Sequence, residues 1–210
     1  MHFGRTGGML SRTERNRSSG TQTGKGTDMK GNLISGIVTS FAAALAGCVT
    51  TGDIAAVRNF EPERYMGTWY EIARLPQYFE RDMDEVRAEY TLNQDGTIRV
   101  VNSGVRDGEA QSITGKAKLS RPNAKPLAGE LRVSFFWPFY SDYRIIELTA
   151  DYDVAVVTAG SRDYLWVLSR KPVMERDELD AIVARMKALG FDVEKLEYPA
   201  PAKPEGDAGP

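Results

Sequence analysis

The sequence predicts an all-β fold, an eight-stranded antiparallel up-and-down barrel with one α-helix packed outside it near the C-terminus. Three observations support this: eight short runs with strand composition, turn residues in the gaps between them, and one amphipathic stretch after the eighth run. Parallel strands need long crossover connections, so the short gaps favour antiparallel neighbours. Closure into a barrel would leave the sheet without exposed edges.

The eight strand-like runs occupy residues 67–75, 86–93, 98–105, 112–120, 131–137, 143–150, 154–159 and 164–170. Turn chemistry separates them, for example Asn-Gln-Asp-Gly at 93–96 and Arg-Asp-Gly at 106–108. Because consecutive runs are joined by such short turns, we expect each strand to pair with the next one along the chain.

The helix is predicted within residues 174–190, where apolar side chains recur at i, i+3, i+4 and i+7 and form one stripe. These side chains are Leu179, Ile182, Val183 and Met186. Acidic residues gather at its start, basic ones lie near its end, and Gly190 suits the position just after a helix. Residues 191–198 are expected to add a ninth strand, and the Pro- and Gly-rich residues 199–210 a disordered tail.

The chain before the barrel divides into three segments. Residues 1–28 are rich in Gly, Ser, Thr and Arg, which predicts either disorder or a start assigned too early, with Met29 the true beginning. Residues 29–47 have a basic residue followed by an apolar run that is too short to span a bilayer, as in a signal peptide. Residues 48–58 would form a flexible tether to the barrel, which begins at about residue 59.

The predicted signal peptide ends in Leu45-Ala46-Gly47-Cys48, which resembles the lipobox of bacterial lipoproteins. There the Cys is acylated and becomes the new N-terminus, and several chains such as palmitate anchor the protein stably. An ordinary signal peptide, or a buried helix with a chance Cys, is the alternative. Cys48 is the only cysteine, so no intramolecular disulfide can form. Val49 in place of Asp resembles the sorting signal for the outer membrane.

Charge and histidine content exclude several classes of function. Removing residues 1–47 takes six basic and two acidic residues from the chain's 27 and 29, which leaves a net charge of about −6 and no basic stripe for nucleic acid. The removed part includes His2, the only histidine. A Ser-His-Asp or Cys-His nucleophile, a typical zinc site and a His-ligated haem are therefore excluded, and we predict no catalytic residue, metal or cofactor.

Three segments carry a family resemblance: "NFEPERYMGTWYEIARLP", "LTADYDVAVV" and "RDYLWVLSRKP", in that order. With the strand count, the helix and the lipobox, they resemble the motifs of the lipocalins, in particular the bacterial outer-membrane lipoprotein lipocalins related to apolipoprotein D. The resemblance covers about residues 59–198. It implies a non-enzymatic carrier of small hydrophobic molecules such as fatty acids or lysophospholipids.

Strand alternation places the motif residues at one closed pole of the barrel. Trp69 stands near the start of the first strand, Arg170 near the end of the eighth, and Asp151 in the loop between the sixth and seventh. Residues 60–66 would cover this pole as a plug, and Arg170 would lie over the indole of Trp69 in a cation–π contact. We interpret these residues, together with Gly67, as structural.

The opposite pole would be the mouth. Two of its four loops, 75–85 and 137–142, are conspicuously aromatic, which favours the rim of an apolar ligand site over a cap folded inward or a homodimer patch. The predicted ligand-binding residues are Tyr78, Phe79, Phe135, Trp137, Tyr143, Arg144, Ile145, Tyr164 and Trp166. Arg144 or Arg81 would meet a carboxylate or phosphate, although a solvated surface charge also explains each. Glu71 is expected to be a buried, hydrogen-bonded carboxylate.

Two rival functions stay open at this point. One is a lipid-acting enzyme that uses carboxylates near the mouth, such as Asp82, Asp84 and Glu85. The other is an envelope interaction protein whose barrel is filled and whose aromatic loops bind a partner. For the carrier, a tether attached at the closed pole would turn the mouth away from the membrane unless the tether bends back.

Overall fold

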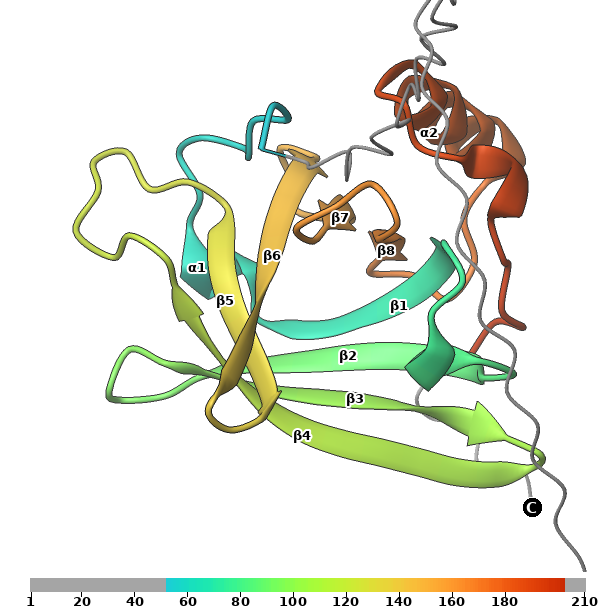
Figure 1. The fold of residues 1–210 in the computed structure, drawn as a ribbon, viewed down its shortest axis with the longest axis horizontal. Coiled ribbons are helices and arrows are strands. Elements are labelled where there is room, and N and C mark those ends of the chain that lie inside the picture. Colours follow the sequence, from blue (N-terminus) through green and yellow to red (C-terminus); the bar gives the residue numbers. More distant parts are fainter. Residues whose placement is uncertain (1–51, 203–210) are drawn as a thin grey trace, which may run out of the picture. The chain divides into compact units, whose positions relative to one another are not determined.

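The computed structural model describes residues 52–202, in which eight antiparallel strands close into one barrel in chain order (Figure 1). The strands are β1 (Gly67–Arg74), β2 (Asp84–Leu92), β3 (Ile98–Arg106), β4 (Glu109–Leu119), β5 (Glu130–Phe136), β6 (Phe139–Leu148), β7 (Val154–Thr158) and β8 (Leu165–Ser169). Pairing between β1 and β8 completes the closure. The predicted fold class is confirmed.

Two hairpins are tighter than the sequence predicts. β6 begins at Phe139 rather than at 143, and β4 begins at Glu109 rather than at 112. Asp107 and Gly108 connect β3 to β4 with φ of 54° and 79°, the left-handed backbone that a two-residue hairpin turn requires. The aromatic loop predicted at 137–142 is therefore mostly strand, with Phe136 paired to Phe139 at its tip.

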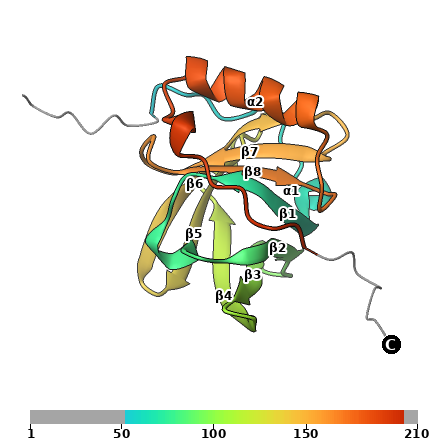
Figure 2. The same ribbon diagram turned by 90° about the vertical axis from the view of Figure 1, so that its right-hand side faces the viewer.

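The helix α2 (Arg176–Ala188) lies outside the barrel across β7 and β8 (Figure 2). Leu179, Ile182 and Met186 are buried there, as their spacing predicts. Gly190 follows the helix with φ +85°, its N–H donates to the carbonyl of Lys187, and the next N–H donates to that of Met186. This is the Schellman arrangement, and it confirms the predicted helix end.

The N-terminal part of the described chain packs on the outside of the barrel. Ile54 is buried, and the backbone of Val57 bonds both ways, its N–H to the carbonyl of Ile145 and its carbonyl to the N–H of Gly129, each at 2.9 Å. The folded body therefore begins before residue 59, because residues 54–58 find apolar and backbone partners that composition does not reveal. The predictions for residues 1–28, 29–47 and Cys48 lie outside the described residues.

The C-terminal segment corrects two further expectations. Residues 191–198 form no ninth strand: they contain a short 3-10 turn, η2 (Val193–Lys195), and one bridge between Glu197 and Arg74. The barrel is already closed, so no free sheet edge remains for a longer strand. The predicted tail is fastened at its start, where the N–H of Ala200 donates to Asp84 Oδ1 at 2.7 Å and its carbonyl accepts from Glu85 at 2.9 Å.

Two short elements complete the fold, α1 (Pro62–Tyr65) before β1 and η1 (Tyr78–Glu80) after it. Within residues 52–202, no helix has the length and apolar character needed to cross a membrane.

Candidate functional site

The closed pole is built on Trp69 and Arg170. The guanidinium carbon of Arg170 lies 3.9 Å from the centroid of the fully buried indole, which confirms the predicted cation–π contact. The indole N–H donates to the carbonyl of Tyr65 at 2.8 Å. Gly67 has φ +91°, a left-handed backbone that favours glycine, and a Cβ there would lie in ordinary contact with Arg170 Nη1 at 3.4 Å.

Arg170 also ties the segments of this pole together. Its guanidinium donates to four backbone carbonyls, those of Thr68, Arg64, Met66 and Tyr152, at 2.7, 3.0, 2.8 and 3.2 Å. Its backbone N–H donates to the carbonyl of Asp153 at 2.8 Å. Nearby, hydrogen bonds, above all with the Thr149 side chain, lower the pKa of the exposed Asp151 carboxyl. The motif residues therefore close the barrel.

Three tyrosines form the floor of the barrel interior above this pole. The hydroxyl of Tyr143 lies 2.8 Å from that of Tyr65 and 2.9 Å from that of Tyr90. Burial raises the pKa of Tyr90 to about 12 and those of Tyr65 and Tyr143 well above their usual value. The hydroxyls therefore stay neutral and bond one another. Ile145, also predicted as a ligand residue, is fully buried beside them.

Aromatic rings line the mouth half of the interior on β5 and β8. Phe135 and Trp166 both pack against the interior cluster, and Tyr164 stacks on Trp166 with ring centroids 6.1 Å apart. Phe135 crosses β4 at Gly115, where a Cβ would lie 2.7 Å from the ring. Glycine at this position therefore makes room for the ring.

A third part of the interior, which the sequence reasoning missed, is formed by inward residues of β2, β3 and β4. Ala88, Asn102 and Ile113 are paired across these strands, and paired residues share a face of the sheet. Ala88 packs on the interior cluster, so Asn102 is on the inward face. Its buried Oδ1 has no hydrogen-bond partner within residues 52–202. The alternation of Ile98, Val100 and Asn102 was the available signal.

A buried ionic network lies between the interior and the β1–β2 loop. Arg74 Nη1 bonds Glu71 Oε1 at 2.7 Å, its Nε bonds Glu197 Oε2 at 3.0 Å, and its Nη2 bonds the carbonyl of Glu80 at 2.9 Å. The Glu80 carboxylate accepts the indole N–H of Trp166 at 3.0 Å. The prediction for Glu71 is confirmed. Arg74 and Glu80 were missed, because a loop residue such as Glu80 has no periodic pattern.

Two of the three carboxyl groups of this network, those of Glu71 and Glu80, hold their protons more tightly than usual. Burial, followed by the charge of Glu80, raises the pKa of Glu71 to about 8 against the opposing effect of Arg74. Burial also raises the pKa of Glu80, although the hydrogen bond from Trp166 opposes it. The network therefore raises the pKa of both carboxyl groups and favours the protonated form of Glu71 at neutral pH.

The aromatic rings of the mouth loops point away from the core. Tyr78, Phe79, Phe136, Trp137 and Phe139 are exposed by 58% to 84%. These five rings therefore do not fold inward as a cap, whereas Phe135 and Tyr143 beside them do pack on the interior cluster. The rings stand on the β1–β2 connection, which contains η1, and at the tip of the β5–β6 hairpin.

The two arginines predicted as headgroup ligands lie apart from the interior rings. Arg144 pairs with Thr158 and donates to the carbonyl of Ile54 at 2.9 Å, so it faces the outer, N-terminal segment. It is not brought together with Tyr143 and Trp166, because neighbouring residues of a strand face opposite sides. The guanidinium of Arg81 lies 5.3 Å from the ring of exposed Tyr78.

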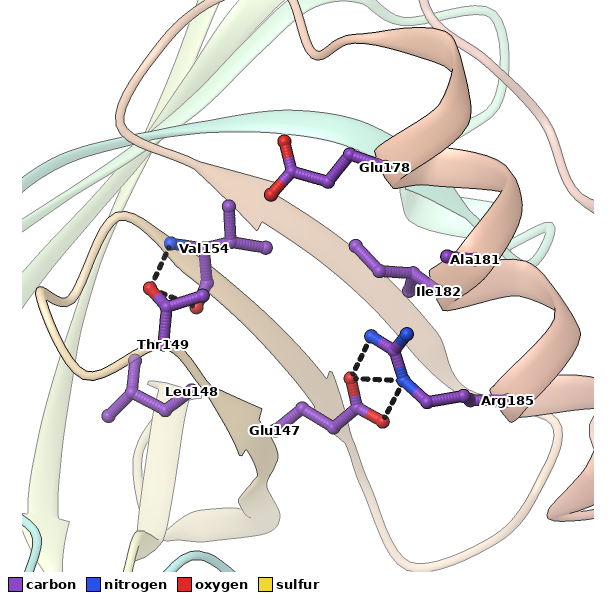
Figure 3. A pocket seen from close by; sticks show the side chains of 8 residues that line it. All are labelled: Glu147, Leu148, Thr149, Val154, Glu178, Ala181, Ile182 and Arg185. Carbon is purple, nitrogen blue, oxygen red and sulfur yellow. Dashed lines mark hydrogen bonds and ion pairs between the residues drawn. The ribbon is translucent and has the colours of Figure 1, made fainter.

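A separate pocket of about 250 Å³ opens between α2 and the outer face of β6 and β7 (Figure 3). It is lined by Glu147, Leu148, Thr149, Val154, Glu178, Ala181, Ile182 and Arg185. Arg185 meets Glu147 with two short hydrogen bonds, 2.9 and 2.7 Å long, so the main charged groups of this pocket hold the helix to the barrel. None of the predicted ligand residues lies here.

Comparison with known proteins identifies the family. Residues 60–201 match the model of the lipocalin-like domain. The chain is 43% identical over 145 residues to "Outer membrane lipoprotein Blc" of Citrobacter freundii (68% of this chain, 80% of that protein) and 31% identical over 147 residues to apolipoprotein D of Macaca fascicularis (66% and 75%). The structure resembles that of insecticyanin from Manduca sexta, with a TM-score of 0.58, 21% identity, and coverage of 70% of this chain and 84% of that one. The chain therefore belongs to the lipocalin family.

Proposed function

We propose that the protein binds fatty acids or lysophospholipids in the mouth half of its barrel. One observation carries this proposal: a buried acceptor without a partner among the described residues, Asn102 Oδ1, on the inward face of β3, in a barrel whose interior also holds the rings of Phe135 and Trp166. A buried polar atom without a hydrogen bond costs about 1 to 3 kcal/mol. A ligand with an O–H or N–H group would remove that cost, as the free glycerol hydroxyl of a lysophospholipid does.

The apolar part of such a ligand would supply most of the affinity. Burying an acyl chain contributes roughly 0.8 kcal/mol per CH₂ group. An eight-stranded barrel is just wide enough either to fill itself with side chains or to hold one small ligand. The tyrosine floor fills the closed half, and Ala88 is a small inward residue on the mouth side of Tyr90 in β2. The acyl chain would lie between the floor and Trp166.

We place this carrier in the bacterial outer membrane, held there by acyl chains on Cys48. The lipobox-like Leu45-Ala46-Gly47-Cys48 supports this location. So does the relative from Citrobacter freundii, which is named an outer membrane lipoprotein.

The rival enzyme reading has less support. Of the three carboxylates that it would use, Asp84 accepts the backbone N–H of Ala200 at 2.7 Å and so fastens the C-terminal segment. The matching family model describes a lipocalin-like domain, and members of that family generally bind ligands without converting them.

The experiment is a titration of the mature protein with palmitate and with lysophosphatidylethanolamine, in which binding is measured by calorimetry and by Trp fluorescence. We expect saturable binding. Ala88→Phe, which places a ring on the inward wall, should weaken palmitate binding at least tenfold, because that ring takes the space of several methylene groups. Glu89→Phe, one residue along β2 on the outward face, is the matched control and should bind as the unmodified protein does.

Absence of saturable binding to either lipid would overturn the carrier and favour a filled barrel. Equal loss of affinity in Ala88→Phe and Glu89→Phe would place the ligand outside the interior. Lipid identified by mass spectrometry after purification from the native membrane would then name the physiological ligand.

A further inference from the structure

We propose that the mouth of the barrel rests on the same bilayer that holds the acyl anchor, with the rings of the two aromatic loops in its headgroup layer. This orientation rests on the proposed acylation of Cys48. It reverses the expectation that the mouth faces away from the membrane, and two independent features of the described residues lead to it.

The first feature is the place where the described chain starts. Asp53 Oδ2 lies 2.6 Å from Arg162 Nη2, and Arg162 belongs to the β7–β8 connection at the mouth end. In the same connection, the carbonyl of Asp163 accepts from Gln77 Nε2 at 2.8 Å, which joins it to the aromatic β1–β2 loop. The chain therefore enters on the mouth side and only then runs along the barrel to Phe60 at the closed pole.

The length of the segment between Cys48 and Asp53 completes this first feature. Cys48 precedes Asp53 by five residues. Five residues span at most about 18 Å when fully extended. The chain uses seven residues to pass from Asp53 to Phe60 beside Tyr152 at the closed pole. A five-residue tether is too short to retrace that path, so the anchor stays on the mouth side.

The second feature is the distribution of exposed apolar side chains. At the mouth, five aromatic rings are exposed, Tyr78, Phe79, Phe136, Trp137 and Phe139. At the closed pole, the large apolar side chains exposed in the described chain are Leu92, at 38%, and Val173, at 64%. Trp and Tyr favour the boundary between water and lipid, where the ring is buried and the polar group stays wet.

Charge does not decide the orientation. Arg81 and Arg106 lie beside Phe79, since Arg106 donates to the carbonyls of Phe79 and Arg81 at 2.9 and 3.0 Å. Exposed Asp82 and Asp107 accompany them. Because positive and negative side chains are mixed here, the exposed apolar rings decide which partner this surface binds. A lipid bilayer suits two aromatic loops on either side of the barrel opening, because its boundary layer can bury the rings of both. A ligand would then pass between membrane and barrel without crossing water.

The test uses the acylated mature protein in phosphatidylcholine vesicles whose acyl chains carry bromine, which quenches Trp fluorescence at short range. Of the three Trp residues, Trp137 is exposed at the mouth, while Trp69 is fully buried. We expect quenching in the unmodified protein and its loss in Trp137→Phe. About half of the Trp137 emission should disappear, because interfacial side chains sit roughly 5 to 10 Å into the headgroup boundary.

The matched control moves the reporter to the other pole. Val173→Trp in the Trp137→Phe background places an exposed Trp just beyond β8, at the closed pole, and should not be quenched. Quenching at Val173→Trp but not at Trp137 would overturn the orientation. Quenching of undiminished size in Trp137→Phe would also overturn the orientation, because Trp137 would then contribute none of it.

Flotation with the vesicles separates this proposal from the anchor itself. Protein that does not float would overturn both the acyl anchor and the orientation, whereas the proposed binding of palmitate would be unaffected. Protein that floats while neither reporter is quenched would keep the anchor and overturn the orientation. A dimer in sedimentation whose Trp137 emission is blue-shifted without vesicles would assign the rings to a second copy of the chain instead.

Discussion

At the scale of single residues, the buried Glu71 shows how strongly the interior penalises charge. Its carboxylate is 2.7 Å from Arg74, yet burial and the nearby Glu80 still raise its pKa to about 8. Arg74 is shared with Glu197 and with two backbone carbonyls, those of Glu80 and Met83. One guanidinium therefore offsets only part of the cost of two buried carboxylates.

This penalty predicts a pH dependence of stability. Between about pH 5 and pH 8, the unfolded chain has released the Glu71 proton while the folded chain still holds it. The free energy of unfolding should therefore fall as pH rises, by up to about 1.4 kcal/mol per pH unit for one proton. Glu71→Gln, which keeps an oxygen for Arg74, should match the unmodified protein at pH 5 and be the more stable one at pH 8.

Urea unfolding at pH 5, 6, 7 and 8 measures both effects. If the unfolding free energy of Glu71→Gln fell with pH as steeply as that of the unmodified protein, the proton that the folded chain retains would belong to Glu80 or to another group. A slope of opposite sign in the unmodified protein would mean that Arg74 keeps both carboxylates charged.

At the scale of elements, α2 depends on a few side chains on one face. Ile182 of α2 is 2% exposed and packs against outward residues of β7 and β8. Its neighbour Val183 is only half-buried. Ile182→Ala should cost about 2 to 5 kcal/mol of unfolding free energy, because it removes methylene groups and leaves a cavity. Val183→Ala, the matched control, should cost about 1 kcal/mol or less. Chemical denaturation compares them, and equal costs would show that the helix rests on the barrel through a different face.

The elements were also the most predictable part of the molecule. Strand composition and the turn residues between the runs placed all eight strands, and the spacing of Leu179, Ile182 and Met186 placed the helix and its buried face. Strand ends were less predictable. Phe139 extends β6 because its partner Phe136 continues the ladder, and only the pairing of two strands reveals that.

Site residues were likewise predictable where local pattern or strand order places them, and not where contacts between distant segments do. Trp69 and Arg170 were predictable because their meeting depends only on strand order. Arg144 was misplaced because its side chain faces the segment around Ile54, a contact between residues far apart in sequence. Glu80 was missed for the same reason, since it reaches Trp166 from a loop.

At the scale of the whole molecule, the barrel has two unlike halves. The closed half is packed with rings and cross-linked by the four carbonyl bonds of Arg170, with the tyrosine hydroxyls bonded above it. The mouth half has exposed loops, and both ends of the described segment, residues 52–202, are fastened near it, at Arg162 and at Glu85. Local openings should therefore concentrate at the mouth, where fewer buried contacts resist them.

Hydrogen exchange can test this division with and without ligand. At short exchange times, when local openings dominate, amides of the β1–β2 and β3–β4 connections should exchange fastest, and palmitate should slow them. Amides of Trp69, Asp153 and Arg170 at the closed pole should be unchanged, because the ligand touches nothing there. Hexanoate at the same concentration is the control, since its short chain buries fewer methylene groups and should protect the mouth amides less. Protection that appears first at the closed pole would place the ligand outside the mouth half. Fast exchange in the mouth loops would then be unrelated to lipid binding.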